Sequence, residues 1–430
     1  MTVYELTSRA IGGMAVSGAQ KAQARVRCGE TREINIQENK ITLMRTLYNT
    51  SATLTAIAGG GKGSLTVNSL SSRDIDEAAK DAALSALSSR SDDANDISPV
   101  EPGEDSFDHG PAECDNELLY NRLAEFLDEA RADYPEILAE GSVSFTTSDI
   151  YLENSNGVRL RSREGHYAFS LGFTARSGGR SSSMNGAGGL SLDLGLPLME
   201  QAGLRELVAQ SVRELDAAPL PGKFTGDIIL SPPCLDDFLS MYASTFLSDS
   251  ALIAGTSPLK DKLGQKVASE ALTVVSEPAA PGVCGYRITA DGYRAKDITI
   301  FGGGVLNTFL LSLYGSKKTG FPRAGNIGDY ARVLPGTLTR GELMESVERG
   351  LLVGRFSGGN PAENGDFSGV AKNSFLIERG AVSRPVCETM VSGNLLSLFS
   401  SVQGVSSCVI SNGMYGQPWL RVSGVTISGA

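Results

Sequence analysis

Residues 227–246 read Asp-Ile-Ile-Leu-Ser-Pro-Pro-Cys-Leu-Asp-Asp-Phe-Leu-Ser-Met-Tyr-Ala-Ser-Thr-Phe, and they take the chain from a strand into a helix. The aliphatic run that ends at Leu230 predicts a strand. Ser231 can cap a helix, and the two prolines after it fit a first helical turn, where no amide donor is needed. Apolar residues then recur at helical spacing, which predicts a helix with one buried face. They are Leu235, Phe238, Leu239, Tyr242 and Phe246.

A break in the pattern precedes this unit. Residues 219–222, Pro-Leu-Pro-Gly, separate a helical pattern from a strand, and such breaks mark domain boundaries. We therefore predict two domains, residues 1–221 and residues 222–430. A chain of 430 residues is long enough for each domain to bury its own core.

The N-terminal domain is predicted to combine several helices with an antiparallel sheet. β-rich segments joined by turn residues indicate strands, and apolar stripes at helical spacing indicate helices. Predicted helices cover residues 4–27, 72–87, 115–133 and 199–217, and predicted strands cover residues 24–58, 64–67 and 142–161. The glycines of residues 59–63 predict a hairpin turn, and the acidic residues 91–111 predict a surface loop or linker.

The C-terminal domain is predicted to be β-rich. From Leu272 onward, short apolar runs alternate with glycine turns, and Trp419–Ile427 forms a β-rich end. Residues 298–316 carry no charge, but their glycines and polar residues favour a strand, a tight turn and a second element over a membrane span. The predicted fold class is α+β, with an N-terminal antiparallel sheet, helices, and a β-rich C-terminal domain.

Histidine is scarce: the 430 residues include only His109 and His166. A three-histidine zinc site is therefore impossible, and neither H-E-x-x-H nor G-x-S-x-G occurs. His166 lies within a strand-like pattern, and His109 lies in the acidic loop. We expect both to be surface or hydrogen-bonded residues without a catalytic role.

Charge and cysteine usage indicate the environment. The chain has 38 basic and 49 acidic residues, a net charge of −11, which argues against a broad nucleic-acid-binding face. Its six cysteines are scattered without metal-site spacing, which predicts buried free thiols in a reducing compartment. No secretory signal pattern stands at the N-terminus. We expect a cytoplasmic protein that binds neither nucleic acid nor membrane.

The order of glycine-rich motifs in the C-terminal half resembles the TldD/PmbA family, bacterial proteins linked to peptide maturation and described as modulators of DNA gyrase. The motifs are Gly255-Thr256-Ser257, residues 262–269 (Lys-Leu-Gly-Gln-Lys-Val-Ala-Ser), Ala290-Asp291-Gly292, residues 302–306 (Gly-Gly-Gly-Val-Leu), Thr319-Gly320, Gly325-Asn326, residues 364–368 (Asn-Gly-Asp-Phe-Ser), residues 391–395 (Val-Ser-Gly-Asn-Leu) and residues 416–422 (Gly-Gln-Pro-Trp-Leu-Arg-Val). The N-terminal half matches more loosely, so the resemblance extends over essentially the whole chain.

The resemblance implies a place for a metal motif. In the TldD branch, H-E-x-x-x-H on a helix and a later cysteine hold zinc, and the glutamate acts as the general base. Counting back from Gly255, the corresponding slots here hold Ser240, Met241 and Thr245, none of which suits zinc. The chain thus resembles the PmbA (TldE) branch, which lacks these residues. Cys408, the candidate for the third ligand, is expected to be a buried thiol.

The resemblance also implies a function. The leading hypothesis is a non-catalytic, peptide-binding subunit of a TldD/TldE-type metalloprotease, inactive alone and without a cofactor, with zinc only in a TldD-type partner. It would form a homodimer or a heterodimer with that partner, and an unfolded or extended peptide would be the substrate. Polar residues in glycine-rich loops can present an extended chain with hydrogen-bonding groups, although they equally suit turns. The candidates for such a peptide groove are Asp291, Asn326, Asn364 and Asp366.

Two alternatives stay open. One is a hydrolase with a non-standard site, which the carboxylates Asp236, Asp237 and Asp249 near the motif helix make conceivable, although such residues more often form a solvated helix face. The other is a homo-oligomeric binding or scaffold protein without a catalytic partner.

Overall fold

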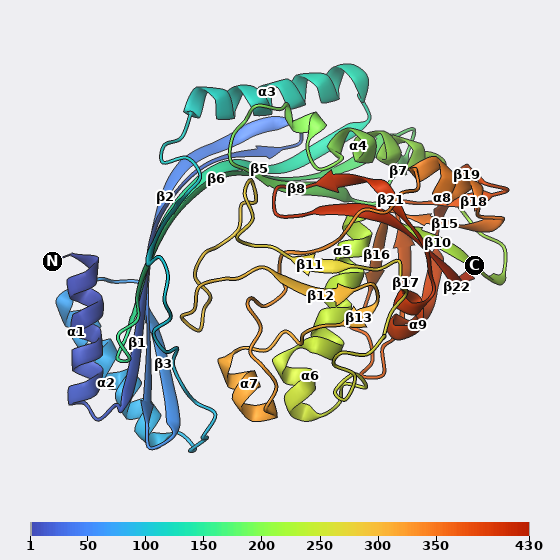
Figure 1. Ribbon diagram of the computed structural model, residues 1–430. Helices are drawn as coiled ribbons and strands as arrows, with labels where there is room; N and C mark the ends of the chain where they lie inside the picture. Colours follow the sequence, from blue (N-terminus) through green and yellow to red (C-terminus); the bar gives the residue numbers. More distant parts are fainter. Residues whose placement is uncertain (1, 430) are drawn as a thin grey trace.

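The computed structural model describes residues 2–429, which form three sheets and the helices around them (Figure 1). The N-terminal sheet is almost wholly antiparallel, in the order β3-β2-β1-β5-β6-β4, with β7 and β8 also paired to β6; only β4 runs parallel to its neighbour. Its strands are β1 (Lys21–Gln37), β2 (Lys40–Ala58), β3 (Gly61–Val67), β4 (Ser106–His109), β5 (Ile137–Asn154), β6 (Arg159–Ser177), β7 (Arg180–Ser181) and β8 (Asn185–Ser191).

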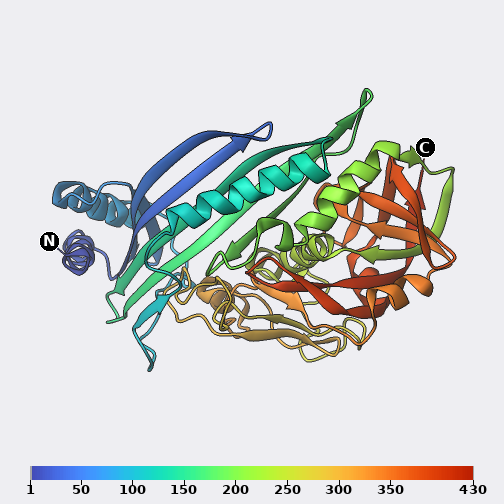
Figure 2. The same ribbon diagram turned by 90° about the horizontal axis from the view of Figure 1, so that it is seen from above.

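Helices cover the outer face of this sheet, and its long strands curve over the C-terminal half (Figures 1 and 2). The helices are α1 (Val3–Val16), α2 (Ser72–Ser88), α3 (Asn116–Asp133) and α4 (Leu204–Arg213), with short 3-10 turns at Leu198–Glu200 and Glu214–Asp216. The alanine stripe of α2 is fully buried. The predicted glycine hairpin at residues 59–63 is confirmed. Its glycines also allow α2 to pack closely against the hairpin, because a Cβ on Gly61 would lie 2.1 Å from the carbonyl oxygen of Ala86.

The C-terminal half contains a mixed sheet in the order β16-β17-β20-β22-β10-β15-β18-β19-β9, with β21 paired to β22. The strands are β9 (Ala218–Pro219), β10 (Lys223–Leu230), β15 (Arg349–Val353), β16 (Arg355–Gly358), β17 (Asp366–Lys372), β18 (Ser374–Glu378), β19 (Ala381–Cys387), β20 (Thr389–Asn394), β21 (Val402–Ser411) and β22 (Gly416–Ser428). A smaller sheet contains β11 (Val274–Ser276), β12 (Ile298–Gly302), β13 (Val305–Leu306) and β14 (Ala331–Val333).

The helix predicted after Ser231 lies at the centre of this half. Ser231 accepts a hydrogen bond from the amide of Cys234, and α5 (Pro232–Tyr242) leads through a π-helical turn (Ala243–Leu247) into α6 (Asp249–Ala254). The ring of Tyr242 makes edge contacts with three phenylalanine rings at 4.9–5.5 Å, which bury this helix in the core. The remaining helices are α7 (Leu313–Thr319), α8 (Arg340–Glu345) and α9 (Leu395–Ser400).

The predicted α+β class, with an antiparallel N-terminal sheet and a β-rich C-terminal half, is confirmed. Residues 298–316 form β12, a turn, β13 and the start of α7, as expected. Within residues 2–429, no helix is both long and apolar enough to cross a bilayer.

Two predicted helices were wrong in extent. Residues 21–27 belong to β1, because Ala22, Ala24 and Val26 alternate into the core beneath α1 and α2. The helix expected over residues 199–217 spans only α4, since Gly203 adopts a left-handed conformation immediately before it.

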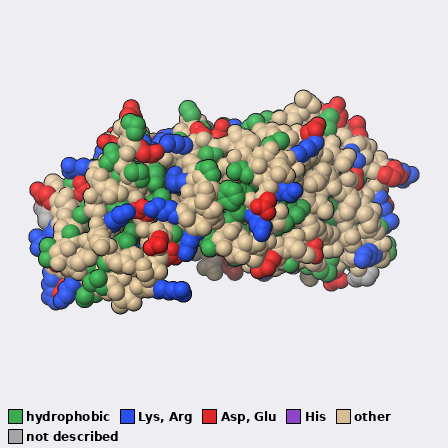
Figure 3. Space-filling view, turned by 60° about the horizontal axis from the view of Figure 1, so that its bottom comes forward, with side chains coloured by type: hydrophobic (Ala, Val, Ile, Leu, Met, Phe, Trp, Pro, Cys, Tyr) green, Lys and Arg blue, Asp and Glu red, His purple; other side chains and the backbone are tan. Residues whose placement is uncertain are grey.

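The acidic segment 91–111 is largely the surface loop or linker that was expected, but it also has buried residues and a short strand. It buries Ala94, Ile97 and Ser98, contains β4, and joins the two halves through ion pairs. Asp96 accepts from Lys21 and Lys317, and Asp92 lies 2.7 Å from Lys318. Figure 3 shows acidic and basic side chains intermixed where the two halves meet.

Candidate functional site

The metal-motif slots lie where α5 passes into its π-helical turn. A π-helical turn pairs residues five apart, so it brings such positions closer together than an α-helix does. Ser240 and Thr245 are five apart across this junction. Ser240 is exposed, Thr245 is half-buried, and Met241 packs against the core.

The side chains at these slots do not fit zinc. Hydroxyl and thioether groups are poor ligands compared with imidazole and thiolate, and no histidine lies in this helix. Across residues 2–429, no three or more His, Cys, Asp or Glu side chains gather closely enough to hold a metal ion. Zinc chemistry therefore has no ligand set in the described part of this chain.

The two histidines and Cys408 lie elsewhere. His109 hydrogen-bonds through Nε2 to the carbonyl oxygen of Val283 at 2.7 Å. His166 is paired opposite Thr146 in the N-terminal sheet, where burial and the nearby Arg27 lower its pKa. Cys408 is exposed on β21, so the expectation that it is buried was wrong. Of the six cysteines, only Cys234 and Cys284 are fully buried, because the others lie on partly solvated faces of their strands or loops.

An open groove follows the exposed face of α5, and we call it the α5 groove. Its middle section, about 640 Å³, is lined by Asp236 and Asp237 of α5, the glycines of β8 and the β21–β22 turn. Asp236 and Tyr415 also line the adjoining section of about 560 Å³, which contains Ser240. At the other end, Pro232, Pro233 and Ile410 are shared with a third pocket. The three hollows therefore adjoin one another along the helix.

One wall of the groove is the edge of β8. Among the described strands, β8 pairs only with β6. The amide of Leu190 points away from β6 and donates to the carbonyl oxygen of Asn412. Because strand backbones alternate, Gly188 and Gly186 turn their N–H and C=O groups to that same side. Both glycines are exposed and line the groove. They can therefore hydrogen-bond to an extended chain.

The opposite wall is acidic. The Tyr415 hydroxyl donates a 2.5 Å hydrogen bond to Oδ2 of Asp236, yet burial keeps the pKa of Asp236 above its ordinary value. Partial burial, together with the Asp236 carboxylate, raises the pKa of Asp237 to about 6. Asp329, in the section with Ser240, accepts from the Tyr286 hydroxyl at 2.9 Å, and burial also raises its pKa. This wall favours a cationic ligand.

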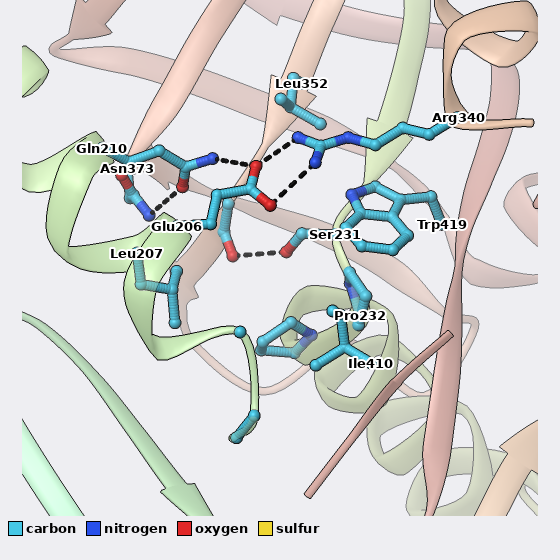
Figure 4. Close-up of a pocket in the computed structure, with 14 residues that line it drawn as sticks. Glu206, Leu207, Gln210, Ser231, Pro232, Arg340, Leu352, Asn373, Ile410 and Trp419 are labelled. Carbon is cyan, nitrogen blue, oxygen red and sulfur yellow. Dashed lines mark hydrogen bonds and ion pairs between the residues drawn. The ribbon is translucent and has the colours of Figure 1, made fainter. Parts of the chain in front are cut away.

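The third pocket is about 410 Å³ and lies between α4 and the C-terminal sheet (Figure 4). We call it the Trp419 pocket. Leu207, Leu352, Ile410 and the indole of Trp419 give it apolar walls, and the Arg340 guanidinium lies over that indole, 4.7 Å from the ring centroid.

A polar network closes one side of the Trp419 pocket. Arg340 pairs with both carboxylate oxygens of Glu206, at 2.8 and 2.5 Å, and Gln210 joins Glu206 to Asn373. Within the described residues, Arg340 Nε and Asn373 Oδ1 are buried without a hydrogen-bond partner. The surface that faces the remaining space is mostly apolar, so an apolar group fits it best.

The predicted peptide-groove residues lie outside the α5 groove. Asp291 is held by Arg323 at 2.7 and 2.8 Å and by the amide of Leu313 at 3.0 Å. Asn326 is 1% exposed and bonds to Ser276 and to backbone groups. Both residues organise loops, and their role in binding stays a prediction.

The other two predicted residues come together at a different place. Asn364 donates to Asp366 at 2.8 Å, and Asn394, the N-cap of α9, donates to both residues at 2.9 Å. This exposed cluster does not line the α5 groove. Its role in binding likewise stays a prediction.

Of the three carboxylates near the motif helix, Asp237 is exposed, as expected of a solvated helix face, whereas the other two make specific contacts. Asp236 is half-buried beneath Tyr415, whereas Asp249 accepts from the amide of Ser312 at 2.9 Å and so joins α6 to α7. The sequence reasoning missed Tyr415, Trp419 and the β8 glycines as site residues. Trp419 does lie in the motif of residues 416–422, but that motif does not show that its indole lines a pocket. No local pattern marks Tyr415 or the β8 glycines, because they reach the groove only through the packing of distant strands.

The comparisons with known proteins agree with this architecture. A structure of a protein from Bacteroides thetaiotaomicron, described as a candidate modulator of DNA gyrase, has a TM-score of 0.86, 24% identity and 99% coverage of both chains. A structure of TldE from Thermococcus kodakarensis has a TM-score of 0.83, 20% identity and coverage of 99% of this chain and all of that one. The chain therefore shares the fold of these two proteins over essentially its whole length.

The sequence matches then identify the family of the C-terminal half. Residues 222–429 match the model of the PmbA/TldA metallopeptidase C-terminal domain. A relative from Methanothermobacter thermautotrophicus described as a metalloprotease is 31% identical over 62% of this chain, and the match spans 63% of that relative, less than two thirds of its length. The C-terminal half of the chain therefore carries a PmbA/TldD-family domain.

Proposed function

We propose that this chain is a non-catalytic, peptide-binding subunit of a TldD/TldE-type metalloprotease acting in cytoplasmic proteolysis or peptide maturation. The observation that carries the proposal is an open groove beside the motif helix, whose slots hold Ser240, Met241 and Thr245. Such a chain keeps a surface for peptide without the ligands for zinc. The metal and the general base would belong to a TldD-type partner.

The free edge of β8 supports peptide binding. An extended peptide can add to an exposed strand edge through main-chain hydrogen bonds, and glycines leave room for its close approach. The exposed glycines Gly186 and Gly188 offer such an edge along one wall of the α5 groove. We propose that this edge is the main-chain recognition element.

A second strand edge supports a subunit partner. β3 pairs with β2 only along residues 52–58. Residues 40–51 therefore have no strand on that side among residues 2–429, which leaves an edge at the rim of the N-terminal sheet (Figure 2). The side chains of Leu43, Met44 and Tyr48 there are 44%, 60% and 76% exposed. A long apolar edge of this kind is normally covered. We propose that a second subunit of the same fold covers it.

Two further assignments remain proposals. We propose that residues 1–221 and 222–430 form the two domains, which the start of the matched family model at residue 222 supports. Asp291, Asn326, Asn364 and Asp366 stay candidates for peptide contacts outside the α5 groove.

The test uses the purified full-length chain and its native host. We expect mass spectrometry to find no stoichiometric zinc, and the chain alone to cleave no unfolded peptide. Affinity purification from the host should recover a zinc-bearing relative, and the mixture should cleave peptides in a chelator-sensitive way. Stoichiometric zinc together with cleavage by the isolated chain would overturn the proposal. Recovery of the chain only with itself would instead favour the scaffold alternative.

A second candidate function, a metal-independent hydrolase, rests on Asp236 and Asp237. Adjacent carboxyl groups with raised pKa values in a groove suit general acid and base roles. Peptide cleavage by the isolated chain that survives chelator and is lost in Asp237→Asn would establish this alternative. We expect no such cleavage.

A further inference from the structure

We infer that the α5 groove selects extended peptides with a branched aliphatic side chain and a cationic side chain two positions apart. This inference rests on the proposed peptide-binding function and adds the chemical class of the peptide. It joins three features that lie side by side along α5: the Trp419 pocket, the free edge of β8 and the acidic wall.

The Trp419 pocket is the subsite for the aliphatic side chain. Its walls are mostly apolar, and Ala202, Pro232, Pro233 and Ile410 border both this pocket and the middle of the groove. A side chain can therefore enter it from a peptide that lies in the groove. A Val, Leu or Ile side chain would match the aliphatic side chains of Leu207, Leu352 and Ile410 that line it.

The acidic wall is the subsite for the cation. Asp236 and Asp237 line the middle of the groove, and among residues 2–429 neither is in an ion pair with a Lys or Arg side chain. The Tyr415 hydroxyl holds Asp236 in place at 2.5 Å. Arg355 lies near enough to Asp237 to offset part of the rise in pKa that burial causes, but it forms no ion pair with it. A Lys or Arg side chain of a peptide would therefore complement these two carboxylates.

Helix geometry sets the spacing between the two subsites. Pro232 borders the Trp419 pocket and Asp236 the acidic wall, and the two are four residues apart on one face of α5. Four residues of helix rise by ~6 Å. In an extended peptide, side chains on one face recur every two residues, at ~7 Å. The aliphatic and cationic residues should therefore be separated by one residue.

The β8 edge would hold the peptide between these subsites. The outward N–H and C=O groups of Gly186 and Gly188 recur at the same two-residue interval as the alternating groups of an extended chain. Main-chain bonds to this edge fix the peptide's direction along the groove, whereas the side-chain subsites choose its sequence.

The inference is tested by fluorescence anisotropy with the intact chain and a labelled heptapeptide, Gly-Ser-Leu-Ser-Lys-Ser-Gly. Matched peptides replace the leucine by serine, or the lysine by serine or glutamate. We expect each single replacement to weaken binding about tenfold, and lysine-to-glutamate more. Moving the lysine next to the leucine should weaken binding similarly.

Two pairs of protein variants separate the subsites. Asp237→Asn should abolish the preference for lysine but leave the preference for leucine, and Asp81→Asn, an exposed carboxylate on α2, should change neither. Leu207→Phe, which narrows the Trp419 pocket, should abolish the preference for leucine but leave the preference for lysine. The volume-conserving Leu207→Met should retain the preference for leucine. Thermal unfolding of each variant controls for misfolding.

Each outcome is decisive. Peptides that all bind equally, or a lysine preference that persists in Asp237→Asn, would overturn this inference while leaving the proposed peptide-binding function standing. Failure of every peptide to bind at millimolar concentration would overturn both. Leucine and lysine preferences lost separately in the two variants would support the inference.

Discussion

The hydroxyl of Tyr415 donates to Oδ2 of Asp236 across 2.5 Å, although 179 residues separate them in the chain. This hydrogen bond joins the β21–β22 turn to α5 and thereby fixes the width of the groove between them. It also supplies the best donor to a half-buried carboxylate whose pKa is already raised by burial.

Tyr415→Phe should destabilise the protein by about 1–2 kcal/mol at pH 7, because it leaves that carboxylate without its hydroxyl donor. Loss of the donor raises the folded-state pKa of Asp236 still further. A carboxyl group whose pKa is higher in the folded than in the unfolded state lowers the free energy of unfolding at pH values above the folded pKa. It has no such effect at pH values below the unfolded pKa. Urea unfolding should therefore show a smaller difference from the parent at pH 3.5 than at pH 7. An equal difference at both values would contradict this account.

Asp237→Asn should stabilise the chain at neutral pH. The folded pKa of about 6 exceeds the ordinary value of 3.8, so the parent loses stability as the pH rises from about 4 to 7. Asparagine removes this cost, and allowing for solvent screening we expect a gain of about 1 kcal/mol at pH 7.5. The gain should vanish below pH 4. Asp81→Asn should be neutral at both pH values, and a pH-independent gain in Asp237→Asn would be inconsistent with the raised pKa.

Asp291→Asn should reduce stability through the loops that this carboxylate holds. Burial alone would raise the pKa of Asp291, but the Arg323 guanidinium, with Thr289 and the amide of Leu313, outweighs burial and holds the pKa below its ordinary value. The stabilisation is present above the unfolded pKa and is lost as the pH falls through the folded pKa. We expect a loss of about 2–3 kcal/mol at pH 7.

The same variant also tests the sequence-based prediction that Asp291 contacts peptide. Denaturant unfolding and peptide anisotropy on one preparation give both readings. A variant that is as stable as the parent but has lost peptide affinity would show that Asp291 acts in binding.

Tyr48→Lys combined with Met44→Lys should disrupt subunit association, because each places a charge on the exposed edge of β2. Light scattering after size exclusion should show the dissociation constant of the two-subunit complex rising at least about tenfold. Val16→Lys changes a 91% exposed apolar residue at the end of α1 and should leave association intact. Dissociation in the control but not in the double variant would place the interface elsewhere.

The local structure of several elements followed directly from sequence. The Ser231 cap, the prolines after it and the apolar spacing of α5 act within one or two helical turns, so no distant contact is needed to predict the helix. The same holds for the glycine hairpin between β2 and β3 and for α3, which Asp115 caps. Where long strands compete with helices, as over residues 21–27, pairing across the sheet overrode the local pattern.

The sequence by itself determined the family motifs, the α+β class and the chemistry at the metal slots, because residue identity alone decides whether Ser240, Met241 and Thr245 can ligate zinc. Only the tertiary structure decided where the groove lies and what lines it. Sheet register places Tyr415, Trp419 and the β8 glycines beside α5. Some of the contacts that set this register join residues more than a hundred positions apart in the sequence, and no local propensity encodes such a contact. Residue chemistry is carried by each position, whereas a groove is a property of how distant segments pack.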